Sequence, residues 1–97
     1  MNKGELVDAI ARRHYEGNRA QAEVALRAVV DTITAETARV GRVAISGFGI
    51  FEKMHREART VRNPKTGAHK DVEAKDYVRF RPGTRLEGMV SGSIPIV

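Results

Sequence analysis

With 97 residues, of which 41% are hydrophobic and 30% charged, the chain is long enough for one globular domain and too hydrophobic for a disordered one. The absence of cysteine excludes disulfides and thiolate-bound metals and suits a reducing cytoplasm. No apolar run approaches the roughly 20 residues of a membrane span, and the N-terminus lacks the apolar segment of a signal peptide.

The formal net charge of +5 is not spread evenly along the chain. Residues 1–46 carry seven Lys or Arg against six Asp or Glu, whereas residues 53–81 carry nine against four. Clustered Lys and Arg create a field that attracts phosphates. The positive segment therefore favours a polyanionic partner.

The N-terminal part of the chain predicts a helical hairpin. Asn2 and Asn18 each precede apolar residues at helical spacing, and each can cap a helix with its side-chain oxygen. We expect a first helix that ends near residue 13. We expect a longer second helix that ends near Val40, with Gly41 as its C-terminal stop.

The pattern then changes to that of strands. We expect a short strand at 42–45 and two longer ones at 48–60 and 68–80, separated by the turn residues of 63–67. Apolar side chains are few between about 53 and 75, so this hairpin cannot pack on both faces. It is predicted to project from a three-stranded antiparallel sheet as a β-ribbon arm.

A short C-terminal helix follows, with Pro82 as its first residue or Thr84 as its cap, and with Gly92 as its end. The predicted fold class is therefore α+β in a single domain, 1–97. Its parts are the helical hairpin and first strand at 1–46, the sheet and arm at 47–81, and the helix at 82–92.

Three phenylalanines are predicted to lie where the strands enter the body: Phe48, Phe51 and Phe80. Without the arm, about three-quarters of the chain remains, and so small a body buries too little surface to be stable alone. A core shared between two chains would stabilise both. We therefore expect these residues to form a dimer core; the alternative is that they fill the core of a monomer.

Three motifs occur in a specific order: G47-F48-G49-I50-F51, R59-T60-V61-R62-N63-P64-K65-T66-G67 and F80-R81-P82-G83. Together they resemble the bacterial HU and integration host factor family of DNA-bending proteins, over nearly the whole chain. The resemblance implies an intertwined homodimer or heterodimer with a helical body and two β-ribbon arms. The arms of this family wrap the minor groove, and a proline at each tip enters between base pairs.

The resemblance also implies residue roles. Pro64 would be the wedge, Asn63 and Gly67 would shape the tip, and Lys3 would touch a phosphate from the body. The remaining candidate DNA contacts are the basic residues of the sheet and arm: Lys53, Arg56, Arg59, Arg62, Lys65, Lys70, Lys75, Arg79 and Arg81. A proline brings a rigid apolar ring and no unpaired N–H into a base stack. Alternatively, Pro64 only closes a tight turn.

The chain departs from a purely basic arm at three acidic residues: Glu57, Asp71 and Glu73. Its apolar end at 93–97 lacks the lysine-rich tail of some relatives, and it either folds back on the body or is disordered. The three histidines are scattered and no catalytic motif is present. We therefore expect neither enzymatic activity nor a metal or cofactor.

Three functions remain in view. The first is an HU-type homodimer of the cytoplasmic nucleoid, which binds double-stranded DNA with little sequence specificity and prefers nicked or distorted DNA. The second is a sequence-selective subunit of the integration host factor type, possible as a heterodimer. The third is a dimeric module whose arms bind acidic proteins. No membrane association is expected of any of them.

Overall fold

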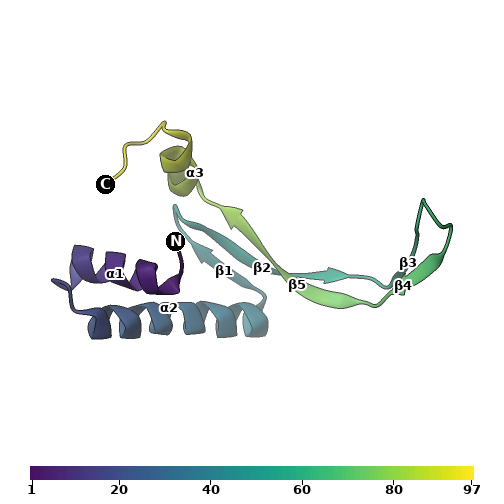
Figure 1. Ribbon diagram of the computed structural model, residues 1–97, viewed down its shortest axis with the longest axis horizontal. Coiled ribbons are helices and arrows are strands. Elements are labelled where there is room, and N and C mark those ends of the chain that lie inside the picture. The colour runs from purple at the N-terminus through teal and green to yellow at the C-terminus, as the bar shows by residue number, and fades with distance from the viewer. The chain divides into compact units, whose positions relative to one another are not determined.

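The computed structural model describes all of residues 1–97, and the chain divides into two compact units, Met1–Ala35 and Glu36–Val97. The elements are three helices and five strands (Figure 1). In chain order they are α1 (Lys3–His14), α2 (Arg19–Val40), β1 (Arg42–Ile45), β2 (Gly49–Arg56), β3 (Arg59–Arg62), β4 (His69–Val72), β5 (Lys75–Pro82) and α3 (Thr84–Ser91). The α+β fold with a β-ribbon arm is confirmed, while the single domain stays a prediction.

The first unit contains α1 and most of α2, and both predicted caps are present. The Asn2 side-chain oxygen accepts a hydrogen bond from the Glu5 N–H at 2.9 Å, and the Asn18 oxygen accepts one from Gln21 at 3.1 Å. The small core of this unit contains three buried residues with partly buried neighbours around them: Val7, Ala11 and Ala22, then Ile10, Tyr15 and Leu26. None of the three helices combines the length and apolar character needed to cross a bilayer.

The second unit is built on the three-stranded antiparallel sheet β1-β2-β5. Gly41 ends α2 with a φ of 92°, as predicted, and β1 begins at the next residue. In the register of the sheet, Phe51 of β2 lies opposite Val43 of β1 and Phe80 of β5. Beyond the sheet, β2 and β5 continue as a two-stranded ribbon toward β3 and β4 (Figure 1).

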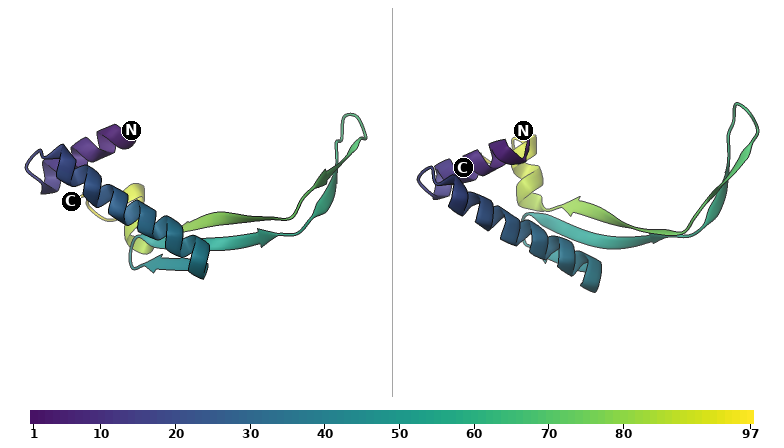
Figure 2. Two further views of the ribbon diagram at one scale, coloured as in Figure 1. Left: turned by 90° about the horizontal axis from the view of Figure 1, so that it is seen from below. Right: turned by 60° about the horizontal axis from the view of Figure 1, so that its bottom comes forward.

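The two predicted long strands are each interrupted once, which corrects the expected strands 48–60 and 68–80. Arg56 lies opposite Lys75 at the end of one ladder, and Arg59 lies opposite Val72 at the start of the next. The break therefore removes two residues from each strand without changing the register. Those residues are Glu57, Ala58, Glu73 and Ala74, of residue types depleted in strands. Figure 2 shows the ribbon changing direction here.

The start of α3 differs from both sequence predictions. Gly83 is the N-cap and Thr84 the first helical residue, while Pro82 still belongs to β5. The reason is a close approach of backbone, because a Cβ on Gly83 would lie 2.7 Å from the Gly47 carbonyl carbon. The Gly83 N–H instead donates to the Phe48 carbonyl oxygen at 2.8 Å. Only glycine fits this junction.

Of the two alternatives that the sequence left open for the apolar C-terminal end, folding back is observed at Ile94. The Ile94 N–H donates to the Gly88 carbonyl oxygen at 3.0 Å, and the Ile94 side chain occupies the space that a Cβ on Gly88 would need. Ile94 therefore folds back on α3, whereas Ile96 and Val97 are exposed. This return covers Gly88, which is buried.

The three phenylalanines form one cluster, as expected. The ring centroids of Phe51 and Phe80 are 4.8 Å apart, and Phe48 lies 5.6 Å from Phe80. Yet Phe48 and Phe80 are exposed, and no large side chain of the chain is fully buried. Other exposed apolar residues lie on both units: Val24, Val29 and Val30 on the first, and Val40, Val78 and Val90 on the second. So much exposed apolar surface on so small a chain marks a protein interface.

We predict that this surface is covered by a second copy of the chain and that folding depends on it. The thermal midpoint should then rise with protein concentration, because dimerisation stabilises only the folded state. Replacing Phe80 by Ala should destabilise the dimer by about 3–5 kcal/mol, as expected for a buried aromatic side chain. Sedimentation and thermal unfolding at several concentrations test this. A chain that sediments as a folded monomer at micromolar concentration would contradict it.

Candidate nucleic-acid interface

The tip of the arm is closed by hydrogen bonds of Asn63. Its side-chain oxygen accepts from the Lys65 N–H at 2.9 Å, and its carbonyl accepts from the Gly67 N–H at 2.8 Å. Gly67 has a φ of 72°, a conformation in which glycine is not strained. The turn is thus completed by the residues around Pro64, and the Pro64 side chain remains exposed. The tip therefore presents an apolar ring to the solvent.

The candidate DNA contacts of the arm fall into two groups. One group makes no ion pair within the chain, and it follows the ribbon from the end of β2 to the start of β5: Arg56, Arg59, Arg62, Lys65, Lys70 and Lys75. All of them are exposed except Arg56, which is half-buried. These positive charges are free to meet an anion.

The other group lies at the foot of the arm and is paired. The Lys53 ammonium lies 3.7 Å from the Asp76 carboxylate and donates to the Ala38 carbonyl at 3.3 Å. Arg79 and Arg81 both bind Glu52. Burial alone would raise the pKa of Glu52, but hydrogen bonds from Arg81 and Arg79 outweigh it and lower that pKa. Glu52 is therefore an anion at neutral pH.

Lys3 stands apart from these residues. It is the first residue of α1 and is exposed, but it belongs to the other compact unit. The arm residues come together on one ribbon, whereas the contact expected from Lys3 stays a prediction. The arm consists of paired strands and contains no helix.

A second polar cluster lies where β2 ends and β5 begins. His55 lies opposite Asp76, and its Nδ1 is 2.7 Å from the Asp76 carboxylate while its Nε2 is 3.1 Å from that of Glu57. The hydrogen bond to Asp76 is the main cause that raises the pKa of His55, and the charge of Glu57 adds to it. The same bond lowers the pKa of Asp76. When it is protonated, His55 forms ion pairs with both Asp76 and Glu57.

Sequence reasoning missed Glu52, His55 and Asp76 as parts of the interface. The cross-strand partners lie more than 20 positions apart along the chain, at separations of 21 residues for His55 with Asp76 and 27 for Glu52 with Arg79. The signal lies in the register, because Glu52 faces Arg79 and His55 faces Asp76 across the same pair of strands. A correct register would have revealed both pairs.

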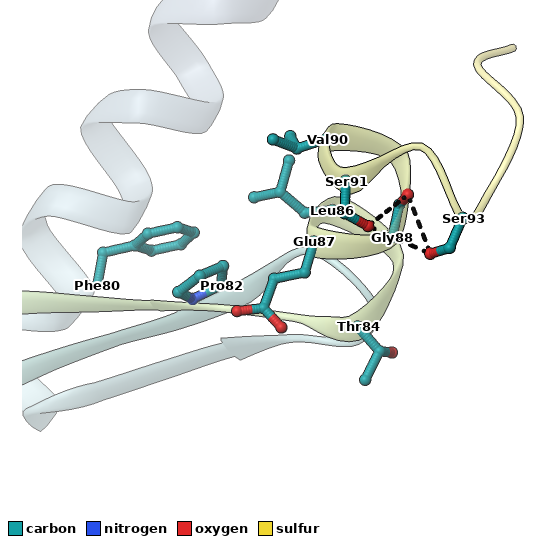
Figure 3. Close-up of a pocket in the computed structure, with 9 residues that line it drawn as sticks. All are labelled: Phe80, Pro82, Thr84, Leu86, Glu87, Gly88, Val90, Ser91 and Ser93. Carbon is teal, nitrogen blue, oxygen red and sulfur yellow. Dashed lines mark hydrogen bonds between the residues drawn. The ribbon is translucent and has the colours of Figure 1, made fainter.

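An apolar groove lies beside α3, between the helix and the end of β5 (Figure 3). Phe80, Pro82, Leu86 and Val90 contribute to its lining. The Ser91 hydroxyl donates to the Gly88 carbonyl oxygen at 3.2 Å. Nothing in the groove resembles a catalytic or metal-binding arrangement, and no cluster of metal-ligating side chains exists in the chain.

A family model described as bacterial DNA-binding protein matches residues 1–91. DNA-binding protein HU 2 of Streptomyces coelicolor is 44% identical over 93 residues, which cover 96% of this chain but only 42% of that protein. The chain thus spans less than half of that relative. DNA-binding protein HU-alpha of Vibrio proteolyticus is 41% identical over 93% of this chain and 99% of its own length.

Integration host factor subunit beta of Marinobacter nauticus is 37% identical over 97% of this chain and 96% of its own. Among solved structures, an Anabaena HU protein in a cocrystal with DNA matches with a TM-score of 0.79 and 37% identity. This match covers 94% of the present chain and 98% of the Anabaena chain. The resemblance to HU and integration host factor is therefore confirmed by sequence and by fold.

The His55 cluster predicts a pH dependence with a definite sign. Since the pKa of His55 is raised above its ordinary value of 6.5, its ion pairs stabilise the ribbon below that pH. This stabilisation disappears as the pH rises through the raised value. In an NMR titration of the ring, the midpoint of His55 should lie above 6.5 and fall in Asp76→Asn. Asp71→Asn is the control, because Asp71 bonds Thr60 instead; equal midpoints in both variants would contradict the assignment.

Proposed function

Because the chain belongs to the family of bacterial DNA-binding proteins, we propose that it is an HU-type architectural protein that binds double-stranded DNA with little sequence specificity. Membership of the family confirms the expectation of a non-enzymatic DNA-binding protein. We further propose that it acts on the nucleoid in the cytoplasm.

The observation that carries this proposal is the line of six unpaired cationic residues along the ribbon. Each Lys or Arg that neutralises a phosphate releases condensed counterions, and this gain does not depend on the base sequence. A narrow ribbon with basic side chains suits a groove that phosphates line on both sides. The DNA contacts are therefore assigned to Arg56, Arg59, Arg62, Lys65, Lys70 and Lys75, with weaker contributions from Lys53, Arg79 and Arg81.

Minor-groove binding with a proline wedge is the mode that the tip supports best. The minor groove distinguishes base pairs poorly, in keeping with a ribbon that carries no set of base-reading side chains. Pro64 is exposed at the end of a turn that Asn63 and Gly67 complete. Insertion of its ring would unstack a base step, and the bend would bring more DNA onto the basic ribbon.

Two copies of the chain would present two such arms. The exposed Phe48 and Phe80, together with the apolar groove beside α3, favour an intertwined homodimer. The likeness to an integration host factor subunit favours a second candidate, a sequence-selective subunit that pairs with a different chain. Binding to a pool of random duplexes and to the duplex selected from it separates the two, since only a selective protein should enrich a sequence. The third candidate, a module whose arms bind acidic proteins, is excluded if unrelated DNA displaces whatever partner the arms have bound.

The affinity for DNA is predicted to depend steeply on salt. If about 6–10 phosphates are neutralised per dimer, affinity should fall by about 10³–10⁵ between 50 and 200 mM salt. Replacing Arg59 and Arg62 by Ala should weaken binding to all sequences alike and lower the salt slope. Fluorescence anisotropy with a random duplex measures both. A nearly flat plot of log affinity against log salt would refute the proposal.

Replacement of Pro64 by Ala is predicted to reduce bending more than affinity. The variant keeps every cation of the arm, so most of its salt-dependent binding to intact duplex should remain. Without the ring it should lose much of the bend and most of the preference for nicked DNA, whose stacking is already weakened. An energy-transfer bend assay beside the anisotropy titration tests this. Wild-type bending by Pro64→Ala would show that Pro64 only closes the turn.

A further inference from the structure

The two faces of the β2–β5 ladder differ in chemistry. Side chains of neighbouring residues point to opposite faces of a strand, while residues opposite each other on two strands share a face. Phe51 lies opposite Phe80, and Glu52 lies opposite Arg79. Glu52, Arg79 and Arg81 therefore share the face that turns away from Phe51 and Phe80.

This placement matters for the DNA interface. If the face with Phe51 and Phe80 packs into the dimer core, the opposite face is the one left for DNA at the foot of the arm. That face carries Arg79 and Arg81, and between them the acidic Glu52. An acidic residue on a phosphate-binding face needs an explanation, because it repels the ligand.

Glu52 is held between the two arginines. The Arg79 guanidinium donates to one carboxylate oxygen at 3.1 Å, and Arg81 donates through its Nε to the other. The Glu52 side chain is only 16% exposed, whereas the arginine side chains are 47% and 53% exposed. Each guanidinium has five N–H donors, so both retain donors for a phosphate. The carboxylate therefore stays next to both cations while they face the solvent.

We propose that Glu52 is an internal counter-anion that limits how strongly Arg79 and Arg81 bind DNA phosphates. This inference rests on the proposed function. Two cations that share one carboxylate carry a local net charge of one, so a phosphate gains less from them than from two free arginines. The free cations lie farther along the ribbon, and the grip of the protein on DNA is thereby shifted from the foot of the arm toward its tip.

The test compares Glu52→Gln with Glu73→Gln on a random duplex. Each variant removes one negative charge, from β2 in the case of Glu52 and from the break between β4 and β5 in the case of Glu73. Glu73, however, is exposed and makes no ion pair. If Glu52→Gln frees one more phosphate contact per arm, the salt slope of the dimer should steepen by about 1.8 and affinity at 0.1 M salt should rise by about tenfold or more. Glu73→Gln should change affinity by less than about threefold and leave the slope unchanged.

A second set of variants shows whether the effect passes through the arginines. In a protein that already carries Arg79→Ala and Arg81→Ala, adding Glu52→Gln should steepen the salt slope of DNA affinity no more than adding Glu73→Gln. In the wild-type background, removing Arg79 and Arg81 should weaken binding less than removing Arg59 and Arg62. This last comparison does not require Glu52→Gln to fold.

Each outcome either supports or overturns the counter-anion role of Glu52. Equal effects of Glu52→Gln and Glu73→Gln overturn the inference, as does an effect that persists without the two arginines. Weaker binding by folded Glu52→Gln overturns it as well, because Glu52 would then hold the arginines in place for DNA. If wild type and Glu73→Gln both fail to bind DNA, the proposed function itself is wrong. If both bind DNA but Glu52→Gln binds it no more tightly, only the role of Glu52 as a counter-anion is refuted.

Discussion

The structure of the second unit depends on one antiparallel register that runs from Gly49 opposite Pro82 to Arg62 opposite His69. This register places Phe51 and Phe80 on one face of the sheet, and Glu52, Arg79 and Arg81 on the other. It also carries the strand pairing across the break, so the turn falls at Pro64. A slip by one residue would exchange the two faces and bury Glu52 where Phe51 now lies. The core and the binding surface are therefore fixed by the same hydrogen bonds.

The ribbon gains little from hydrophobic burial. Both short strands of its outer part, β3 and β4, are almost wholly exposed, and a two-stranded hairpin is marginal in water by itself. Cross-strand contacts such as the Thr60 hydroxyl on the Asp71 carboxylate, 3.0 Å apart, supply part of the cohesion. Two of the three acidic residues of the arm thus have structural partners, Asp71 with Thr60 and Glu57 with His55, and all three reduce the repulsion among its cations. What looks like dilution of the DNA-binding charge also helps the arm to hold its shape.

Much of the fold follows from local signals in the sequence. Asn2, Asn18 and Gly41 mark helix ends through short-range hydrogen bonds or a left-handed backbone, which depend only on residues nearby in the sequence. The start of α3 escaped prediction because the approach of Gly47 to Gly83 is set by tertiary packing. The pairing of Glu52 escaped because it requires the cross-strand register. The motifs predict the basic residues and Pro64 as DNA contacts, but which cations are free and which are paired depends on the three-dimensional structure.

The interruption between the two ladders has a mechanical consequence. Backbone hydrogen bonds between paired strands are what make a ribbon resist twisting, and here both strands lack them at the same level. The outer and inner segments can therefore turn about a common joint, while the unchanged register keeps their faces aligned. A force applied at Pro64 would reach the unpaired Glu57-Ala58 and Glu73-Ala74 segments before it reached the aromatic cluster. The arm is thus two paired segments joined by an unpaired one, and a bend at that point would leave the aromatic cluster at its foot undisturbed.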